Sequence, residues 1–296
     1  MKRCFSTSLK NALRFSIAML LILALLSGCN KTPYDATPSE SSPVESPSQS
    51  LAEPATPEPS TEPITLNIGS YNIANGSHVK YDISKLGEDI KSKNLDIVGV
   101  QEVDQNVLRS GRINTMKLLS ESSGLPYFKF FKAISLSGGS YGVGVLSKYP
   151  ITDSTIHKLY SGNEEQRVLG HAVIDVNGVS VNFLVTHLSF ESKELRDAQF
   201  AALGEVTAKL DNFIVTGDFN TSDFLEYKAI NNANMVNSSS YNVNTFPSPN
   251  PGSSIDNIVF SKYHWKFGLP AVLPNGKSDH CMLYAKGTFY PEGIKK

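Results

Sequence analysis

The sequence is poor in cysteine and in net charge, and each shortage excludes a class of protein. Of its three cysteines, Cys4 and Cys29 lie in a leader-like N-terminal segment. Cys281 alone is left for the rest of the chain, so no intramolecular disulfide is predicted. Residues 64–296 hold 22 basic and 22 acidic side chains, and so lack the overall positive charge typical of nucleic-acid-binding domains. With 40% hydrophobic residues in 296, the composition is that of a globular protein with a large core.

Long apolar runs are also missing, and the run at 15–26, FSIAMLLILALL, is too short to cross a bilayer, which takes about 20 residues. Residues 1–29 contain no acid, and the basic side chains are Lys2, Arg3, Lys10 and Arg14. A basic start followed by a short apolar run is typical of a secretory signal. We therefore predict that residues 1–29 are a leader and not part of the fold.

The leader ends in LSGC, with the cysteine at position 29. This ending resembles the lipobox of bacterial lipoproteins, in which the cysteine is acylated and becomes the mature N-terminus. Several acyl chains on Cys29 would hold the protein firmly at a membrane, where a single chain would not. The resemblance predicts a lipid-anchored protein on the outer face of the cell membrane.

Residues 30–63 differ from both flanking segments. Eight of the sixteen prolines and six acidic residues fall within 31–63, with one lysine and no apolar periodicity. Such a composition does not bury enough surface to fold. At about 3 Å per residue it would form a semi-rigid spacer with a reach of up to roughly 100 Å. We predict a disordered linker over 30–63 and one folded domain over 64–296.

Strands dominate the predicted domain. Alternating or continuous apolar patterns predict strands near 64–74, 95–103, 141–147, 213–218, 254–261 and 280–289, with 95–103 buried on both faces. Asn177-Gly178 predicts a hairpin between 171–176 and 179–188. Helical periodicity covers 82–93 and 191–210. This mixture favours an α/β fold with two mixed sheets packed together and covered by helices.

Polar side chains gather where these strands stop or start. They are Asn72, Glu102, His187, Asp218, Asn220, Asp256, Asp279 and His280. Each alone is unremarkable, and the Gly, Asp, Asn and Thr of GDFNT are turn-forming residues in any protein. Together they supply oxygen ligands for a hard cation and two imidazoles. Phosphoester hydrolysis needs such an ion, a base for the attacking water and donors for the developing charge.

The ordered set YN, QEVD, YGVGVLSKYPI, THL, GDFN, TFPSPNPGSSIDNIVF and SDH resembles the endonuclease/exonuclease/phosphatase family, which has the deoxyribonuclease-I-like fold. The resemblance covers essentially all of 64–296. It implies a four-layered α/β sandwich, with two mixed β-sheets between helical layers. It also implies a hydrolase that uses Mg²⁺, with Mn²⁺ as an alternative.

The resemblance implies a role for each strand-end residue. Glu102 is the expected metal ligand, with Asn72 and Asp279 beside the metal. Asp218 is expected to orient or deprotonate the attacking water, Asn220 to bind a phosphoryl oxygen, and His280 to be the catalytic imidazole. The remaining two residues are Asp256, expected to fix His280, and His187, expected to contact the phosphate or protonate the leaving group.

Four features stay open at this point. Arg167 fits either a phosphate-binding group or a structural ion pair, and Tyr141 matches no family role. Asn257 stands where relatives often have an aromatic residue or an arginine. The aromatic side chains of 262–268 fit a strand that packs on one face, or less readily a membrane-touching ribbon.

The resulting hypothesis is a monomeric, membrane-tethered, Mg²⁺-dependent phosphoesterase that acts by in-line attack of an activated water. Its substrate would be a lipid headgroup, a small phosphoester or a nucleic acid. An extracellular nuclease is the first alternative, which the neutral domain disfavours. A non-catalytic binding lipoprotein on the same fold is the second, although a binding module has no need of the whole set of polar groups.

Overall fold

The computed structural model describes residues 61–295. The predicted leader and nearly all of the predicted linker lie outside this range, so the acylation of Cys29 stays a prediction. No helix within the described residues is long and apolar enough to cross a membrane.

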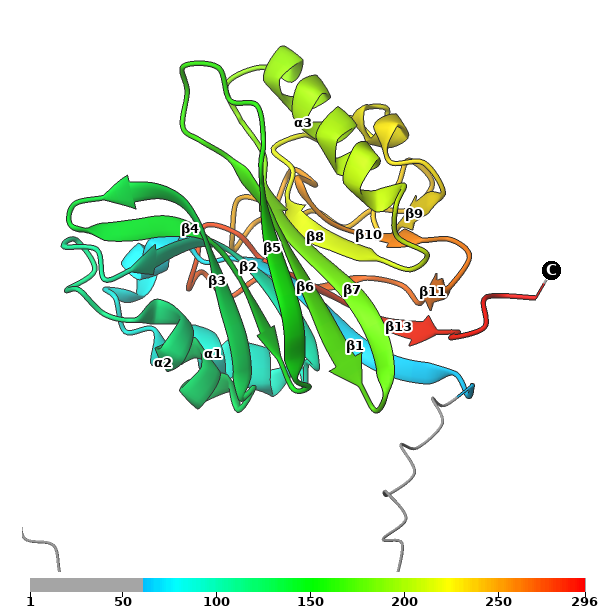
Figure 1. Ribbon diagram of the computed structural model, residues 1–296. Coiled ribbons are helices and arrows are strands. Elements are labelled where there is room, and N and C mark those ends of the chain that lie inside the picture. Colours follow the sequence, from blue (N-terminus) through cyan, green and yellow to red (C-terminus); the bar gives the residue numbers. More distant parts are fainter. Residues whose placement is uncertain (1–60, 296) are drawn as a thin grey trace, which may run out of the picture. The chain divides into compact units, whose positions relative to one another are not determined.

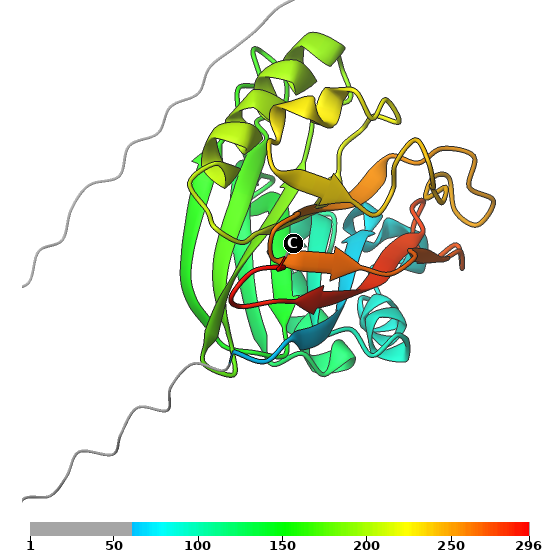
Figure 2. The ribbon, with the colours of Figure 1, turned by 90° about the vertical axis from the view of Figure 1, so that its right-hand side faces the viewer.

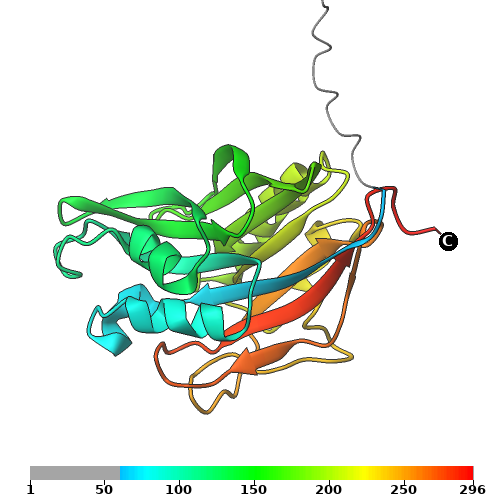
Figure 3. The same ribbon diagram turned by 90° about the horizontal axis from the view of Figure 1, so that it is seen from below.

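Two mixed β-sheets form the centre of the domain (Figure 1). The first contains, in spatial order, β11 (Trp265–Phe267), β13 (Met282–Phe289), β1 (Ile64–Asn72), β2 (Ile97–Gln105), β4 (Gly139–Ser147) and β3 (Tyr127–Leu136), and β12 (Ala271–Leu273) also pairs with β13. The second contains β5 (Ile151–Lys158), β6 (Val168–Val176), β7 (Val179–His187), β8 (Ile214–Asp218), β10 (Asp256–Ser261) and β9 (Ala233–Met235). The parallel pairs are β1–β2 and β7–β8. The chain thus ends its last strand, β13, beside its first, β1 (Figure 3).

Helices cover the outer face of each sheet (Figure 2). On the first sheet these are α1 (Ser84–Ser92) and α2 (Thr115–Ser123), with the 3₁₀ segment η1 (Ala74–Val79) following β1. On the second they are α3 (Lys193–Thr207) and η2 (Glu226–Ala229). Asn114 and Ser192 cap α2 and α3 by accepting hydrogen bonds from backbone N–H groups of the first turn.

Three apolar cores separate the resulting four layers. One lies between the sheets, and two lie between a sheet and its helices. Strand β2 contributes Ile97 to the central core and Val98 and Val100 to the outer one, as predicted for a strand buried on both faces. The predicted four-layered sandwich is confirmed.

The two sheets approach each other closely at Gly99 of β2. A Cβ atom at this position would collide with Oγ1 of Thr216 in β8 and lie 3.0 Å from Cγ2 of Val185 in β7. Only glycine permits this approach. It brings Glu102, three residues further along β2, to the same end of the molecule as Asp218.

Several elements were not expected from the sequence. They are α2, β3, β5, β9 and β12. The stretch 262–268 does form a strand, β11, and Trp265 is buried in the central core. Its packing therefore follows the first of the two interpretations above.

Candidate functional site

The predicted site residues meet where strands of both sheets end. Asn72, His187 and Asp218 are the last residues of β1, β7 and β8, and Asp256 is the first residue of β10. Asp256 and Asp218 are direct partners in the antiparallel β8–β10 pair, and His187 pairs with Asp218 in the parallel β7–β8 pair. The backbone ladder therefore fixes the relative positions of these side chains.

The side-chain amide of Asn72 joins the two sheets. Its Nδ2 donates to Oε1 of Glu102 at 3.1 Å and to Oδ2 of Asp218 at 3.0 Å. Its Oδ1 accepts the backbone N–H of Ala74 at 3.0 Å, which fixes the orientation of the amide. In this arrangement Asn72 orients the carboxylate of Glu102 through its nitrogen.

Glu102 lies inside β2 and not at its last residue, and the predicted strand over 95–103 also contains it. The β2–β4 pairing shifts its register between Val100 and Val103, and Glu102 has a φ of 57° within this bulge. Bulges re-aim side chains, and a left-handed conformation is unfavourable for a residue with a side chain. Burial raises the pKa of Glu102 and the charge of Asp279 adds to the rise, whereas the hydrogen bond from Asn72 opposes it.

His280 lies between two carboxylates. Its Nδ1 is 2.8 Å from Oδ2 of Asp256, and its Nε2 is 3.4 Å from Oδ2 of Asp218. Burial by itself would lower the pKa of His280, but the charges of Asp256, Asp218 and Asp279 and the hydrogen bond to Asp256 raise it to about 10. The imidazole is therefore a cation at neutral pH in this arrangement.

The carboxylate of Asp218 is almost fully buried, with 2% of its surface exposed. Burial raises its pKa above the ordinary aspartate range, and the charge of Asp256 adds to this rise. The positive charge of His280 and the hydrogen bonds from Asn220 and Asn72 act in the opposite direction and lower the pKa. A carboxylate whose pKa is moved toward neutrality is better suited to accept a proton from water.

His187 faces Asp218 from the neighbouring strand, with 3.5 Å between Nε2 and Oδ2. Its Nδ1 lies 3.2 Å from Nη1 of Arg167, which also forms an ion pair of 2.9 Å with Glu165. Arg167 is 5% exposed. The ion pair and the contact with His187 make Arg167 part of the site, and Glu165 is a site residue that the sequence analysis missed.

Asn220 reaches the site by a different route from the expected one. An extended segment would place the side chains of Asp218 and Asn220 on one side, but Asn220 has a φ of 52°. Its N–H donates to Oδ1 of Asp218 at 2.9 Å, and its Nδ2 donates to the carbonyl of Leu188 at 2.9 Å. Phe219 between them is fully buried, with its ring 5.7 Å from that of Phe200.

These groups surround a cavity of about 280 Å³. Tyr141, Phe190, Phe246 and Ile255 form part of its wall, and its polar lining consists of Glu102, Glu165, Arg167, His187, Asp218, Asn220 and His280. The ring of Phe246 lies 4.9 Å from the imidazole of His280. Asn257 does not line this cavity. Its side chain instead exchanges hydrogen bonds with the backbone N–H and carbonyl of Asn237.

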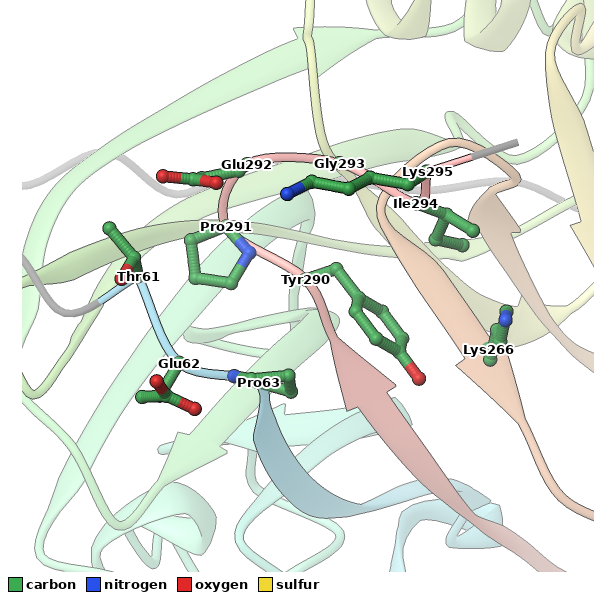
Figure 4. Close-up of a pocket in the computed structure, with 10 residues that line it drawn as sticks. All are labelled: Thr61, Glu62, Pro63, Lys266, Tyr290, Pro291, Glu292, Gly293, Ile294 and Lys295. Atoms are coloured by element: carbon green, nitrogen blue, oxygen red, sulfur yellow. The ribbon is translucent and has the colours of Figure 1, made fainter.

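A larger pocket, of about 440 Å³, lies where β1 begins and the C-terminal segment ends (Figure 4). Its lining includes Pro63, Lys266, Tyr290 and Lys295. None of the predicted site residues lines it. The smaller cavity is therefore the candidate active site.

Two groups of side chains fit a cation on chemical grounds. Ligand atoms of Asp218, Asp256 and His280 lie within 4.8 Å of one another, but the hydrogen bond between His280 and Asp256 places a proton between two of them. Glu102 and Asp279, the expected metal ligands, are the second group, and they lie close enough for the charge of Asp279 to raise the pKa of Glu102. No ion pair within residues 61–295 involves either carboxylate, and hard cations prefer such oxygens.

A sequence profile of the Endonuclease/Exonuclease/phosphatase family matches residues 64–280. Protein cwh43 of Schizosaccharomyces pombe is 24% identical over 200 residues, which is 67% of this chain and 18% of that protein's length. A family member from Bacteroides thetaiotaomicron superposes with a TM-score of 0.65 at 20% identity, over 80% of this chain and 99% of its own. The mannosyl-6-phosphatase of the same organism superposes with a TM-score of 0.60 at 18% identity, over 74% of this chain and 98% of its own.

Proposed function

The chain belongs to the endonuclease/exonuclease/phosphatase family, and we propose that it is a Mg²⁺-dependent phosphoesterase. One observation carries the proposal. The Asn72 amide bonds to both Glu102 and Asp218, so that an expected metal ligand and an expected base are held at one cavity together with two imidazoles. A merely structural cluster would not leave two partly buried carboxylates without a cationic partner.

In the proposed reaction a water molecule attacks phosphorus in line with the ester oxygen that leaves. The new P–O bond forms from the water while the old one breaks, and the leaving ester oxygen takes up a proton from the solvent. Asp218 accepts a proton from the water, for which its raised pKa suits it. His280, held as a cation by Asp256, stabilises the negative charge that develops on the phosphoryl group.

Glu102 and Asp279 would hold the metal, with Asn72 orienting Glu102. Mg²⁺, or Mn²⁺ in its place, would supply positive charge to the phosphoryl oxygens. Mg²⁺ typically takes one or two carboxylates and completes its shell with water and substrate phosphate. The two carboxylates fit that pattern.

The cavity favours a small phosphoester over a nucleic acid. Its volume of about 280 Å³ suits a single headgroup or sugar phosphate better than a polymer. Among the described residues, the cationic side chains that line it are Arg167 and the imidazolium of His280, and no lysine lines it. Nucleic-acid-binding sites instead use many Lys and Arg side chains along the backbone. One structural neighbour, the mannosyl-6-phosphatase, is named for a small phosphoester substrate, a sugar phosphate.

The leader and lipobox motivate the second half of the proposal, a monomeric enzyme anchored through Cys29 to the outer face of the cell membrane. The linker over 30–63 would hold the catalytic domain away from the lipid surface. The substrate would then be extracytoplasmic.

A substrate screen tests the proposal. The protein is incubated with Mg²⁺, Mn²⁺ or EDTA and offered sugar phosphates, bis(p-nitrophenyl) phosphate, phospholipid vesicles, DNA and RNA. Metal-dependent release of product from small phosphoesters is expected. Preferential cleavage of DNA or RNA would replace the proposal with a nuclease, and no hydrolysis of any substrate would favour a binding protein.

A further inference from the structure

Arg167 lies against one ring nitrogen of His187, and this contact restricts the histidine. Strands β6 and β7 pair with Leu169 opposite Thr186, which brings the residue before β6 beside the end of β7. Nη1 of Arg167 is 3.2 Å from Nδ1 of His187 and 2.9 Å from Oε1 of Glu165. Both the arginine and the histidine are buried, so the contact is shielded from water.

A guanidinium group has only hydrogen-bond donors. Nδ1 of His187 must therefore accept, and it cannot carry a proton while the contact exists. A neutral imidazole has one N–H, which is then on Nε2. The tautomer of His187 follows from the identity of its neighbour.

The other ring nitrogen faces an unusual environment. Nε2 of His187 lies 3.1 Å from Nδ2 of Asn220 and 3.5 Å from Oδ2 of Asp218. Because Nδ2 of Asn220 also donates to the carbonyl of Leu188, its orientation is set and it too presents an N–H. Two donors thus face each other at the cavity, with one carboxylate oxygen at the limit of reach. A single anionic oxygen that lies beside the pair, within hydrogen-bond distance of both nitrogens, would accept from both.

We propose that Arg167 is a positioning residue that holds His187 as the neutral Nε2–H tautomer, so that His187 and Asn220 present paired donors to one oxygen of the substrate. The use of these donors on a phosphoester rests on the proposed function, whereas the tautomer does not. Arg167 is accordingly neither a direct phosphate ligand nor a bare structural ion pair. Its action on the substrate passes through His187.

The electrostatic surroundings agree with this role. Burial lowers the pKa of His187 well below its ordinary value, and the positive charges of Arg167 and His280 lower it further. The charged groups that face His187 are Arg167 beside β6, with Glu165 behind it, Asp218 at the end of β8, and His280 before β13. A histidine kept neutral in this way donates one hydrogen bond without titrating across the physiological range.

The tautomer can be observed without any turnover. Long-range ¹H–¹⁵N correlation spectra of the ¹⁵N-labelled protein distinguish a protonated from an unprotonated ring nitrogen, and the His187→Gln variant assigns the signals. In the wild type we expect a proton on Nε2 and none on Nδ1 of His187, unchanged between about pH 6 and 8. A proton on Nδ1, a mixture of tautomers or titration of His187 in this interval would overturn the proposal.

The Arg167→Met variant removes the donor and the charge but keeps an unbranched side chain. His187 should then populate both tautomers and titrate closer to its ordinary value of about 6.5. The pH profile of turnover should gain an ionisation that the wild type lacks. The matched control is Arg196→Met, which removes a partly buried arginine bonded to Glu226 and should leave the His187 signals unchanged.

A folded Arg167→Met protein with the wild-type tautomer and pH profile would contradict the proposal. If this variant does not fold, the tautomer observed in the wild-type spectrum is by itself the test of the proposal. Absence of phosphoesterase activity would refute the proposed function and leave the tautomer measurement valid, so the two failures are distinguishable.

Discussion

Asn72, at the end of β1, donates a hydrogen bond of 3.0 Å to the carboxylate of Asp218, at the end of β8. The two residues belong to different sheets and are 146 positions apart in the sequence. Because the same amide nitrogen also reaches Glu102, the expected metal ligand and the expected base share one donor. The packing of one sheet on the other therefore controls the geometry of the candidate active site.

Replacement of Glu102 by Gln should weaken the metal site, because a neutral amide is a poorer ligand for a hard cation than a carboxylate. We expect the Mg²⁺ concentration for half-maximal activity to rise by about 10- to 100-fold, the range seen when groups around a metal are changed. Excess Mg²⁺ should restore part of the rate. A Mg²⁺ titration of hydrolysis checks this, and an unchanged titration curve would remove Glu102 from the metal site.

Addition of a methyl group at Gly99 should disturb the contact between the sheets. Gly99→Ala would place a Cβ against Thr216, and overpacking of this kind typically costs about 1–3 kcal/mol of unfolding free energy. Gly252→Ala is the control, since nothing lies within 4 Å of a Cβ there, and exposed substitutions change stability by about 0.5 kcal/mol or less. Urea unfolding measures both. Equal stabilities of the two variants would contradict the close approach of β2 and β8.

The Asp256–His280 contact predicts a specific pH dependence of stability. The pKa of His280 is raised from 6.5 to about 10 in the folded protein, so the contact stabilises the fold fully below pH 6.5 and loses its effect as pH rises through about 10. The difference in unfolding free energy between the wild type and Asp256→Asn should therefore be largest near pH 6 and shrink toward pH 10. Measurements in EDTA exclude metal effects.

The control for this series is Asp197→Asn, which removes an exposed ion pair with Lys193 and should change stability little at any pH, because solvent screens exposed ion pairs. If the Asp256→Asn difference stayed constant from pH 6 to pH 10, the imidazolium assignment of His280 would be wrong.

The anchor hypothesis makes a prediction that needs no substrate. Cells that express the wild type and are fed a clickable fatty acid should label the protein, and Cys29→Ala should abolish the label. Cys281→Ala is the matched control and should keep it, because Cys281 is buried in the domain. A wild-type protein that never takes up the label would refute the anchor at Cys29.

The strand-end positions could be predicted from the sequence because apolar runs mark where strands stop. Asn72, His187 and Asp218 end their strands as expected. The positive φ values of Glu102 and Asn220 could not be predicted, because such conformations are imposed by surrounding structure and not by local preference. The short helix α2 was missed because its nine residues include three serines and show little periodicity.

Glu165 and Phe246 show a different limit of the sequence. Both lie in irregular segments, where no period indicates which way a side chain points. The only local signal for Glu165 was its place two residues before Arg167. The partner of Arg167 across the hairpin, His187, was identifiable as a site residue, but the contact between them depends on the β6–β7 register.

The central claim is that Asp218 and His280 act on one phosphoester at this cavity, and single-turnover hydrolysis of the best substrate from the screen tests it most directly. With saturating Mg²⁺, Asp218→Asn and His280→Ala should each lower the rate by at least roughly 10²-fold, the lower end of the range for general acid–base groups. The double variant should lose less than the product of the two single losses, because the residues act as a unit. Circular-dichroism melts establish that the variants are folded. Near-wild-type rates in both folded single variants would contradict the mechanism.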